Sequence, residues 1–171
     1  MPSRTLVSVD EYLHTSYDPD CDYVDGAIVE RNVGERDHSE LQGEIYAYFR
    51  SLGRKLKIRP YIEQRVQVSS SRFRIPDICV VHGARPTEQI FTKPPLIAIE
   101  ILSKDDRVSA MQERIDDYLN FGVRYVWVID PRTHRAWAHT KDGNQEAKDG
   151  ILRTLDPEIE LPLPEIFQAL Q

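Results

Sequence analysis

Hydrophobic residues recur at helical spacing in two long segments of the chain. The first covers residues 38–52, with Asp37 placed to cap it, and its apolar positions follow at intervals of four, three and four: Leu41, Ile45, Tyr48 and Leu52. The second begins after Asp105 or Asp106, ends near Gly122, and repeats the helical period: Val108, Met111, Ile115, Tyr118 and Leu119. Both patterns predict amphipathic α-helices that pack on a core.

Shorter runs rich in β-branched and aromatic residues predict strands around these helices. Residues 96–102 are apolar except for Glu100, which is typical of a central strand covered on both faces. Asp25-Gly26 tolerates the positive φ angles of a tight turn and predicts a hairpin over residues 22–30. Further strands are expected at 62–68, 72–81, 124–129, 135–139 and 151–155, with short helices at 9–14, after the capping pair Ser8 and Glu11, and near the C-terminus.

Size and composition indicate one globular domain over residues 1–171. The chain has 171 residues, of which 40% are hydrophobic and 29% charged, and it shows no repeat, linker or low-complexity stretch. We expect a mixed α/β (α+β) fold. No apolar run is long enough to cross a membrane, no signal peptide is evident, and Cys21 and Cys79 read as reduced thiols, so a cytoplasmic location is expected.

The charge balance limits the ways in which this chain can bind nucleic acid. Its net charge of −6 opposes nonspecific attraction to phosphate backbones. Basic residues nevertheless gather in one region: Arg50, Arg54, Lys55, Lys57, Arg59, Arg65, Arg72 and Arg74. This region is either a solvated helix end with its neighbouring strands or a local surface that steers a nucleic-acid strand.

Two acidic residues suggest a metal site. Glu100 lies inside the buried strand, where an isolated carboxylate costs several kcal/mol unless it is paired, protonated or bound to metal. Asp77 follows Pro76 and precedes another buried run. If their strands are neighbours, the two carboxylates can share a hard divalent cation. The alternative is structural, with Glu100 paired to an arginine such as Arg74 and Asp77 merely ending a strand.

These residues belong to a set of motifs that resembles a known family. The motifs are Tyr23-Val24-Asp25-Gly26, His38 at a helix start, Ile75-Pro76-Asp77-Ile78, Ile99-Glu100-Ile101-Leu102-Ser103, Arg114 four residues before Tyr118, and the run from Gly122 to Pro131. Together they resemble the Uma-two-type endonuclease family of the PD-(D/E)XK, or restriction-endonuclease-like, superfamily. The resemblance implies a mixed β-sheet flanked by helices, here with additional antiparallel hairpins, and Mg²⁺- or Mn²⁺-dependent hydrolysis of nucleic-acid phosphodiesters, with DNA favoured over RNA.

The resemblance assigns roles residue by residue. Asp77 corresponds to the first metal-binding acid and Glu100 to the second, with the carbonyl of Ile101 as a further ligand. The lysine expected two positions after the glutamate is Leu102 in this chain. Relatives often carry a basic residue in the following helix instead, and Arg114 occupies that position.

The remaining candidates each have a second interpretation. Arg114 would stabilise a phosphate, with Lys104 as the alternative donor, or would pair on the surface with Asp117. His38 would orient water or contact substrate, or would be a hydrogen-bonded core residue. Weaker candidates for the site are Glu44 and Asp22.

Other readings of the whole chain follow from the same residues. Leu102 favours a binding or interaction module that keeps the nuclease fold without turnover. A hydrolase of smaller phosphoesters is a third possibility. Trp127 and Trp137 are expected in the core or at a homodimer contact, with base stacking as a less favoured role.

Overall fold

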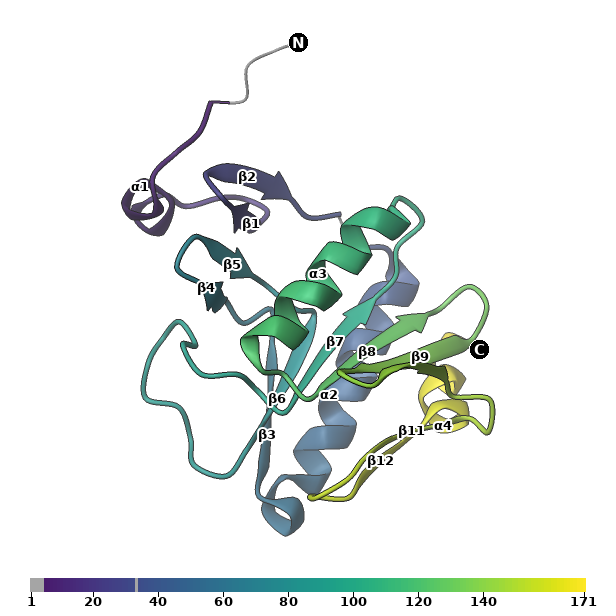
Figure 1. Cartoon of the computed structure of the whole chain (residues 1–171). Helices are drawn as coiled ribbons and strands as arrows, with labels where there is room; N and C mark the ends of the chain where they lie inside the picture. The colour runs from purple at the N-terminus through teal and green to yellow at the C-terminus, as the bar shows by residue number, and fades with distance from the viewer. Residues whose placement is uncertain (1–4, 33) are drawn as a thin grey trace.

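The computed structural model describes residues 5–32 and 34–171, and a six-stranded mixed sheet lies at its centre (Figure 1). In spatial order the strands are β10 (Gly143–Glu146), β9 (Arg135–Thr140), β8 (Tyr125–Asp130), β7 (Ile97–Ile101), β6 (Ile78–His82) and β3 (Ile58–Ile62). β7 pairs with β8 in parallel and with β6 antiparallel. The central position predicted for the Glu100 strand is therefore confirmed.

Two helices cover the two faces of this sheet, α2 behind it and α3 in front of it in Figure 1. α2 (Arg36–Leu56) buries Leu41, Ile45 and Phe49 in the same cluster as Trp127 of β8. α3 (Val108–Phe121) buries Met111, Ile115 and Tyr118 on the opposite face. The helical periodicity in the sequence was thus a correct guide to both elements.

The helix starts differ from those expected. Glu35, not Asp37, is the N-cap of α2, and Arg107, not Asp105 or Asp106, is the N-cap of α3; neither cap makes a side-chain hydrogen bond. Asp106 instead accepts hydrogen bonds from the Ser103 amide and the Asn32 side chain. The end of α3 is as predicted, because Gly122 adopts the left-handed conformation, with φ of 113°.

A second sheet holds the N-terminal part of the chain beside α3. Its order is β2 (Ala27–Glu30), β1 (Cys21–Val24), β5 (Arg72–Arg74) and β4 (Val66–Ser69), and helix α1 (Val9–His14) packs against it. The hairpin around Asp25 and the serine cap of α1 are confirmed. The run expected as one strand over residues 72–81 is broken: β5 belongs to this sheet and β6 to the main sheet, with Asp77 just before β6.

The C-terminal part adds β11 (Ile151–Thr154), β12 (Ile159–Pro162), α4 (Leu163–Phe167) and a 3₁₀ turn at Gln168–Leu170. Leu161, Leu163, Ile166 and Phe167 extend the core on the α2 side of the main sheet. Cys21 and Cys79 are both buried and unbonded to each other. Among the described residues, no helix combines the length and the hydropathy that a bilayer span requires.

Candidate active site

Asp77 is fixed to the neighbouring strand β7. The amide N–H of Ile101 donates a 2.7 Å hydrogen bond to Asp77 Oδ2. Arg31, just beyond β2, donates to Asp77 Oδ1 at 2.9 Å. The backbone is held as well, since the Gln42 side chain of α2 donates to the Asp77 carbonyl at 3.0 Å. These contacts determine where the carboxylate points.

Glu100 lies beside Asp77 because of the strand register. Ile78 of β6 is opposite Ile99 of β7 in an antiparallel pair, so the residue before Ile78 is next to the residue after Ile99. The Glu100 side chain faces α3, where Tyr118 Oη donates to Oε1 at 2.6 Å and Arg114 Nη1 lies 3.5 Å from Oε2. The residue is only 1% exposed. The strand register therefore places the two acidic residues opposite each other.

Burial and neighbouring charge perturb the Glu100 carboxyl. Desolvation raises its pKa above the ordinary value, Arg114 opposes this, and the nearby Asp77 carboxylate adds to it. The hydrogen bond from Tyr118 stabilises the ionised form. Since Asp77 repels the charged form of Glu100, a cation between the two would relieve a like-charge contact.

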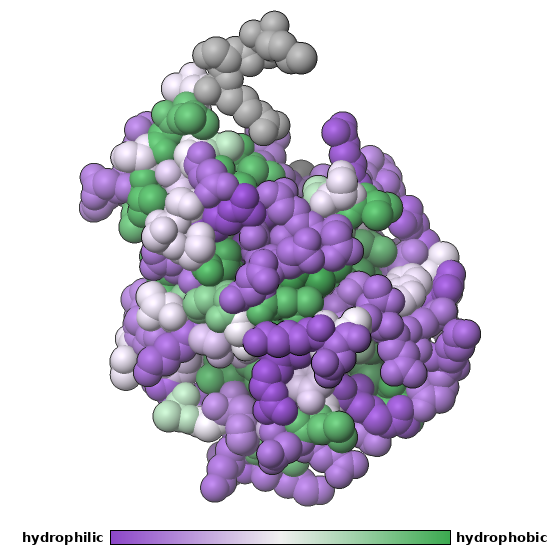
Figure 2. Space-filling view, in the orientation of Figure 1, coloured by the Kyte–Doolittle hydropathy of each residue, from purple (hydrophilic) through white to green (hydrophobic). Residues whose placement is uncertain are grey.

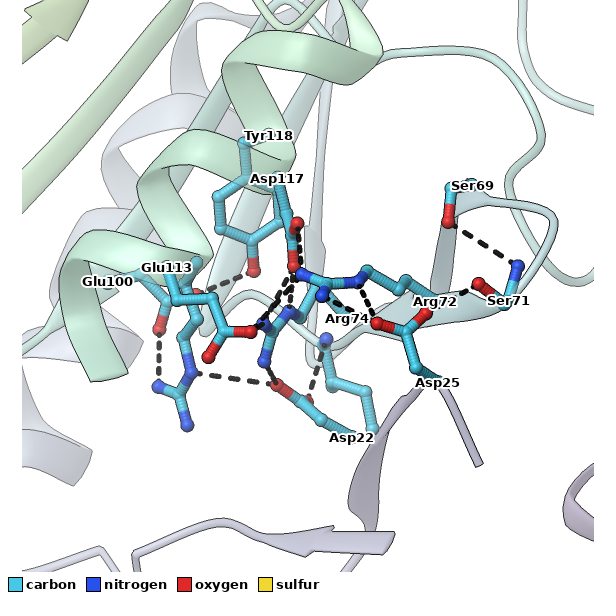
Figure 3. Close-up of polar contacts among 12 residues, drawn as sticks. Asp22, Asp25, Ser69, Ser71, Arg72, Arg74, Glu100, Glu113, Asp117 and Tyr118 are labelled. Carbon is cyan, nitrogen blue, oxygen red and sulfur yellow. Dashed lines mark hydrogen bonds and ion pairs between the residues drawn. The ribbon is translucent and has the colours of Figure 1, made fainter. Parts of the chain in front are cut away.

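Arg114 bridges two acids instead of pairing with Asp117. Its Nη1 lies 3.5 Å from Glu100 Oε2 and its Nε lies 3.5 Å from Asp22 Oδ2. The surface pairing with Asp117 is wrong: Asp117 binds Arg72 and Arg74, as Figure 3 shows. Glu100 likewise does not pair with Arg74, whose guanidinium contacts Asp22 and Asp117. Arg114 is thus a basic residue beside Glu100 on the α3 side of the sheet.

Asp22 belongs to a buried charge network that also contains Arg74 and Asp117 (Figure 3). It is 1% exposed, accepts from the Ile75 amide, and contacts Arg74 Nη1 at 3.1 Å. Its contacts with two guanidinium groups place it as a support for Arg114. The sequence offered Asp22 only as a weaker site candidate.

His38 contacts Asp77 from the first turns of α2. Its Nε2 lies 3.2 Å from Asp77 Oδ2. Burial alone would lower the pKa of His38, but the hydrogen bond to Asp77 and the attraction of that carboxylate leave the pKa raised. The imidazole is therefore hydrogen-bonded to Asp77, as one of the two interpretations of the sequence expected.

A small opening of about 20 Å³ reaches Asp77, while Glu100 lies behind it and does not line it. Its lining residues are Arg31, Asn32, His38, Asp77, Ile101, Ser103, Asp106 and Arg114. Lys104 and Glu44 are not among them: Lys104 forms an exposed ion pair with Glu35, and Glu44 is exposed on α2.

Arg31 was not predicted as a residue of the site. It lies in a short connection after β2, outside any periodic segment, and it meets Asp77 only through the contact between the two sheets. No spacing in the sequence signals that contact.

The donor chemistry at the site fits a hard divalent cation. Two carboxylates and the Ile101 peptide supply oxygen donors, and Mg²⁺ often binds through one or two carboxylates and keeps several waters. In the described residues, no three or more His, Cys, Asp or Glu side chains form a group able to hold a metal by themselves. Arg31 and Arg114 already neutralise the acids, so a bound ion would replace part of these guanidinium contacts.

The mixed sheet with a helix on each face is that of a restriction-endonuclease-like nuclease fold. The chain belongs to the family described as "Uma2: Putative restriction endonuclease", which matches residues 9–171. A solved structure, "a putative nuclease belonging to DUF820 from Anabaena variabilis ATCC 29413", has a TM-score of 0.84, with 23% identity, over 96% of this chain and 99% of that chain. No curated protein matches this chain. The family predicted from the motifs is thus confirmed.

Proposed function

We propose that this chain is a metal-dependent endonuclease that hydrolyses phosphodiester bonds in DNA. The observation that carries this proposal is the junction of β6 and β7, where Asp77 binds the peptide next to Glu100 and both carboxylates meet basic side chains. Family membership supports nuclease chemistry. Asp77 and Glu100 would hold Mg²⁺ or Mn²⁺, with the Ile101 carbonyl as a further ligand.

The bound ion would supply a water of lowered pKa and neutralise charge at the phosphate. Arg114 and Arg31 are the residues able to hold the phosphate oxygens, because a guanidinium offers paired donors and stays charged. Neither arginine can act as a general base. His38 would orient a water molecule from its position beside Asp77.

Leu102 replaces the superfamily lysine, and its side chain packs in the apolar cluster on the α3 side of the sheet. Leucine can neither hold a phosphate nor position water. Arg114 approaches the same face from α3 and would provide the missing positive charge.

A supercoiled plasmid incubated with Mg²⁺ or Mn²⁺ tests this proposal. Wild type is expected to convert it to the nicked form only with metal, and Asp77→Asn is expected to slow the conversion by about 100-fold or more, because an amide is a weaker metal ligand. Asp10→Asn is the matched control, because Asp10 is an exposed residue of α1. Equal background in wild type and Asp77→Asn would overturn the proposal.

An inactive binding module is the second candidate, favoured by Leu102 and by the guanidinium groups already present on both acids. It predicts that calorimetric titration with Mn²⁺ gives no heat that depends on Asp77 or Glu100. Cleavage of a generic phosphodiester without plasmid nicking would instead indicate a hydrolase of small phosphoesters.

A further inference from the structure

A groove of about 380 Å³ lies on the α3 side of the main sheet. Its apolar lining comes from the strand ends and the inner side of α3: Leu102, Val128, Met111 and Ile115. Figure 2 shows hydrophobic surface between α3 and strands β8 and β9, with hydrophilic surface around it. Its volume lies at the lower end of the range for small-molecule sites.

The groove adjoins the candidate active site. Ser103 and Asp106 line both the groove and the small opening above Asp77. Leu102 lies two positions after Glu100, so its side chain is on the same face of β7. A nucleotide chain with its phosphate at the acids can therefore place a neighbouring base in the groove.

Trp137 provides a flat aromatic surface in this groove. It lies on β9 opposite Val128, and it is only partly buried. The guanidinium of Arg135 lies 5.0 Å from the centre of the indole ring, and Glu146 holds Arg135 through two hydrogen bonds of 2.7 and 2.9 Å. These contacts fix the ring before any ligand binds, which reduces the entropy cost of stacking.

The rim of the groove carries two arginines, Arg107 and Arg132, against one acid, Asp106, although the whole chain is acidic. Arg107 at the rim pairs with no carboxylate of the described residues, and Arg132 pairs with Asp130. Gln112 and Asn144 add amide groups that can both donate and accept hydrogen bonds. Positive charge, amides and an aromatic plane match a nucleotide better than a purely apolar ligand.

We propose that this groove binds the base of an unpaired nucleotide in the DNA strand held at Asp77 and Glu100. The base would stack on Trp137, and the rim arginines would contact its backbone. A base in an intact duplex is stacked on both sides and cannot enter such a groove without being extruded. This inference rests on the proposed function, because the active site would position the strand.

Fluorescence anisotropy of a labelled single-stranded oligodeoxynucleotide, without divalent metal, tests the groove. Trp137→Ala is expected to weaken binding about tenfold or more, as loss of one stacking contact does. Trp137→Phe should restore most of the affinity, since it keeps an aromatic face. Tyr48→Ala is the control, because Tyr48 packs on the α2 side of the main sheet and binds the Glu160 carbonyl, away from the groove. The same sequence as a duplex should bind more weakly and should not respond to Trp137→Ala.

Several results would overturn this assignment. One is equal single-strand affinity of wild type and Trp137→Ala. Another is a loss of single-strand affinity in Trp137→Ala that Trp137→Phe does not restore. An equal loss of duplex affinity in Trp137→Ala would also overturn it. Tighter binding of single-stranded RNA would contradict the choice of DNA. A change from dimer to monomer in Trp137→Ala, with oligonucleotide affinity unchanged, would assign the groove to a second copy of the chain.

The experiments distinguish failure of the groove proposal from failure of the endonuclease proposal. Plasmid nicking together with Trp137-independent binding would remove the groove alone. Trp137-dependent binding of single strands, without nicking in any metal, would remove the endonuclease and keep the nucleotide site.

Discussion

Glu100 keeps a carboxylate in an almost fully buried position because each of its oxygens has a polar partner. Tyr118 binds one oxygen and Arg114 lies near the other, while Asp77 is similarly paired with Arg31. A buried acid without such partners would cost several kcal/mol. The same pairing keeps both acids in place.

Tyr118→Phe tests the support around Glu100. The substitution removes only the hydroxyl that donates to Glu100 Oε1, so the carboxylate becomes less firmly oriented. Loss of such a supporting hydrogen bond typically costs 10–100-fold in metal affinity or activity, and we expect a decrease of about tenfold in Mn²⁺ affinity by calorimetry. Tyr48→Phe is the matched control, since its hydroxyl binds the Glu160 carbonyl outside the site. Equal Mn²⁺ affinity of wild type and Tyr118→Phe would show that this bond does not orient a ligand.

Among the helices and strands, Arg74 connects three elements. Its guanidinium, 2% exposed, contacts Asp22 of β1 and Asp117 of α3 while its backbone is part of β5. Arg72 adds contacts to Asp25 and Asp117, as Figure 3 shows. The second sheet is therefore attached to α3 by buried charge as well as by apolar packing. Arg114, which reaches the active site, belongs to the same network through Asp22.

Arg74→Met is expected to lower the free energy of unfolding by about 3 kcal/mol, because it leaves two buried carboxylates with one fewer cation each. Urea denaturation followed by tryptophan fluorescence measures this change. Arg153→Met is the control, since Arg153 forms only exposed pairs with Asp149 and Glu160, and exposed pairs contribute little. A similar small effect in both variants would mean that the buried network does not stabilise the fold.

The sequence predicted those helices and strands whose hydrophobic patterns lie within one continuous segment. The two long helices and β7 follow from periodicity and from an uninterrupted apolar run. β3 was missed because it is an edge strand that contains Pro60, and β10 because its residues, Gly143–Glu146, are polar. Pro76 indicated an irregularity in the run over residues 72–81, but the change of sheet at Ile75–Asp77 was not predicted, because it leaves no periodic signal.

For the whole molecule, the site is assembled from segments far apart in the sequence. Asp77 and Glu100 could be predicted because an acid in an apolar strand and a proline-aspartate pair are visible locally. The contact of Arg31 with Asp77 and the ion pair between Asp22 and Arg114 could not be predicted, because they depend on how the second sheet packs against α3. With a net charge of −6, the proposed binding of DNA would depend on local features such as these and the groove.

The proposed endonuclease would require a divalent cation bound between Asp77 and Glu100. Crystals soaked in Mn²⁺ and measured for anomalous scattering test this directly. We expect one strong peak with oxygen ligands from both carboxylates, with Arg31 or Arg114 displaced from its acid, and no peak in Asp77→Asn crystals. A map without a peak between the two acids, with both guanidinium contacts unchanged, would contradict the account.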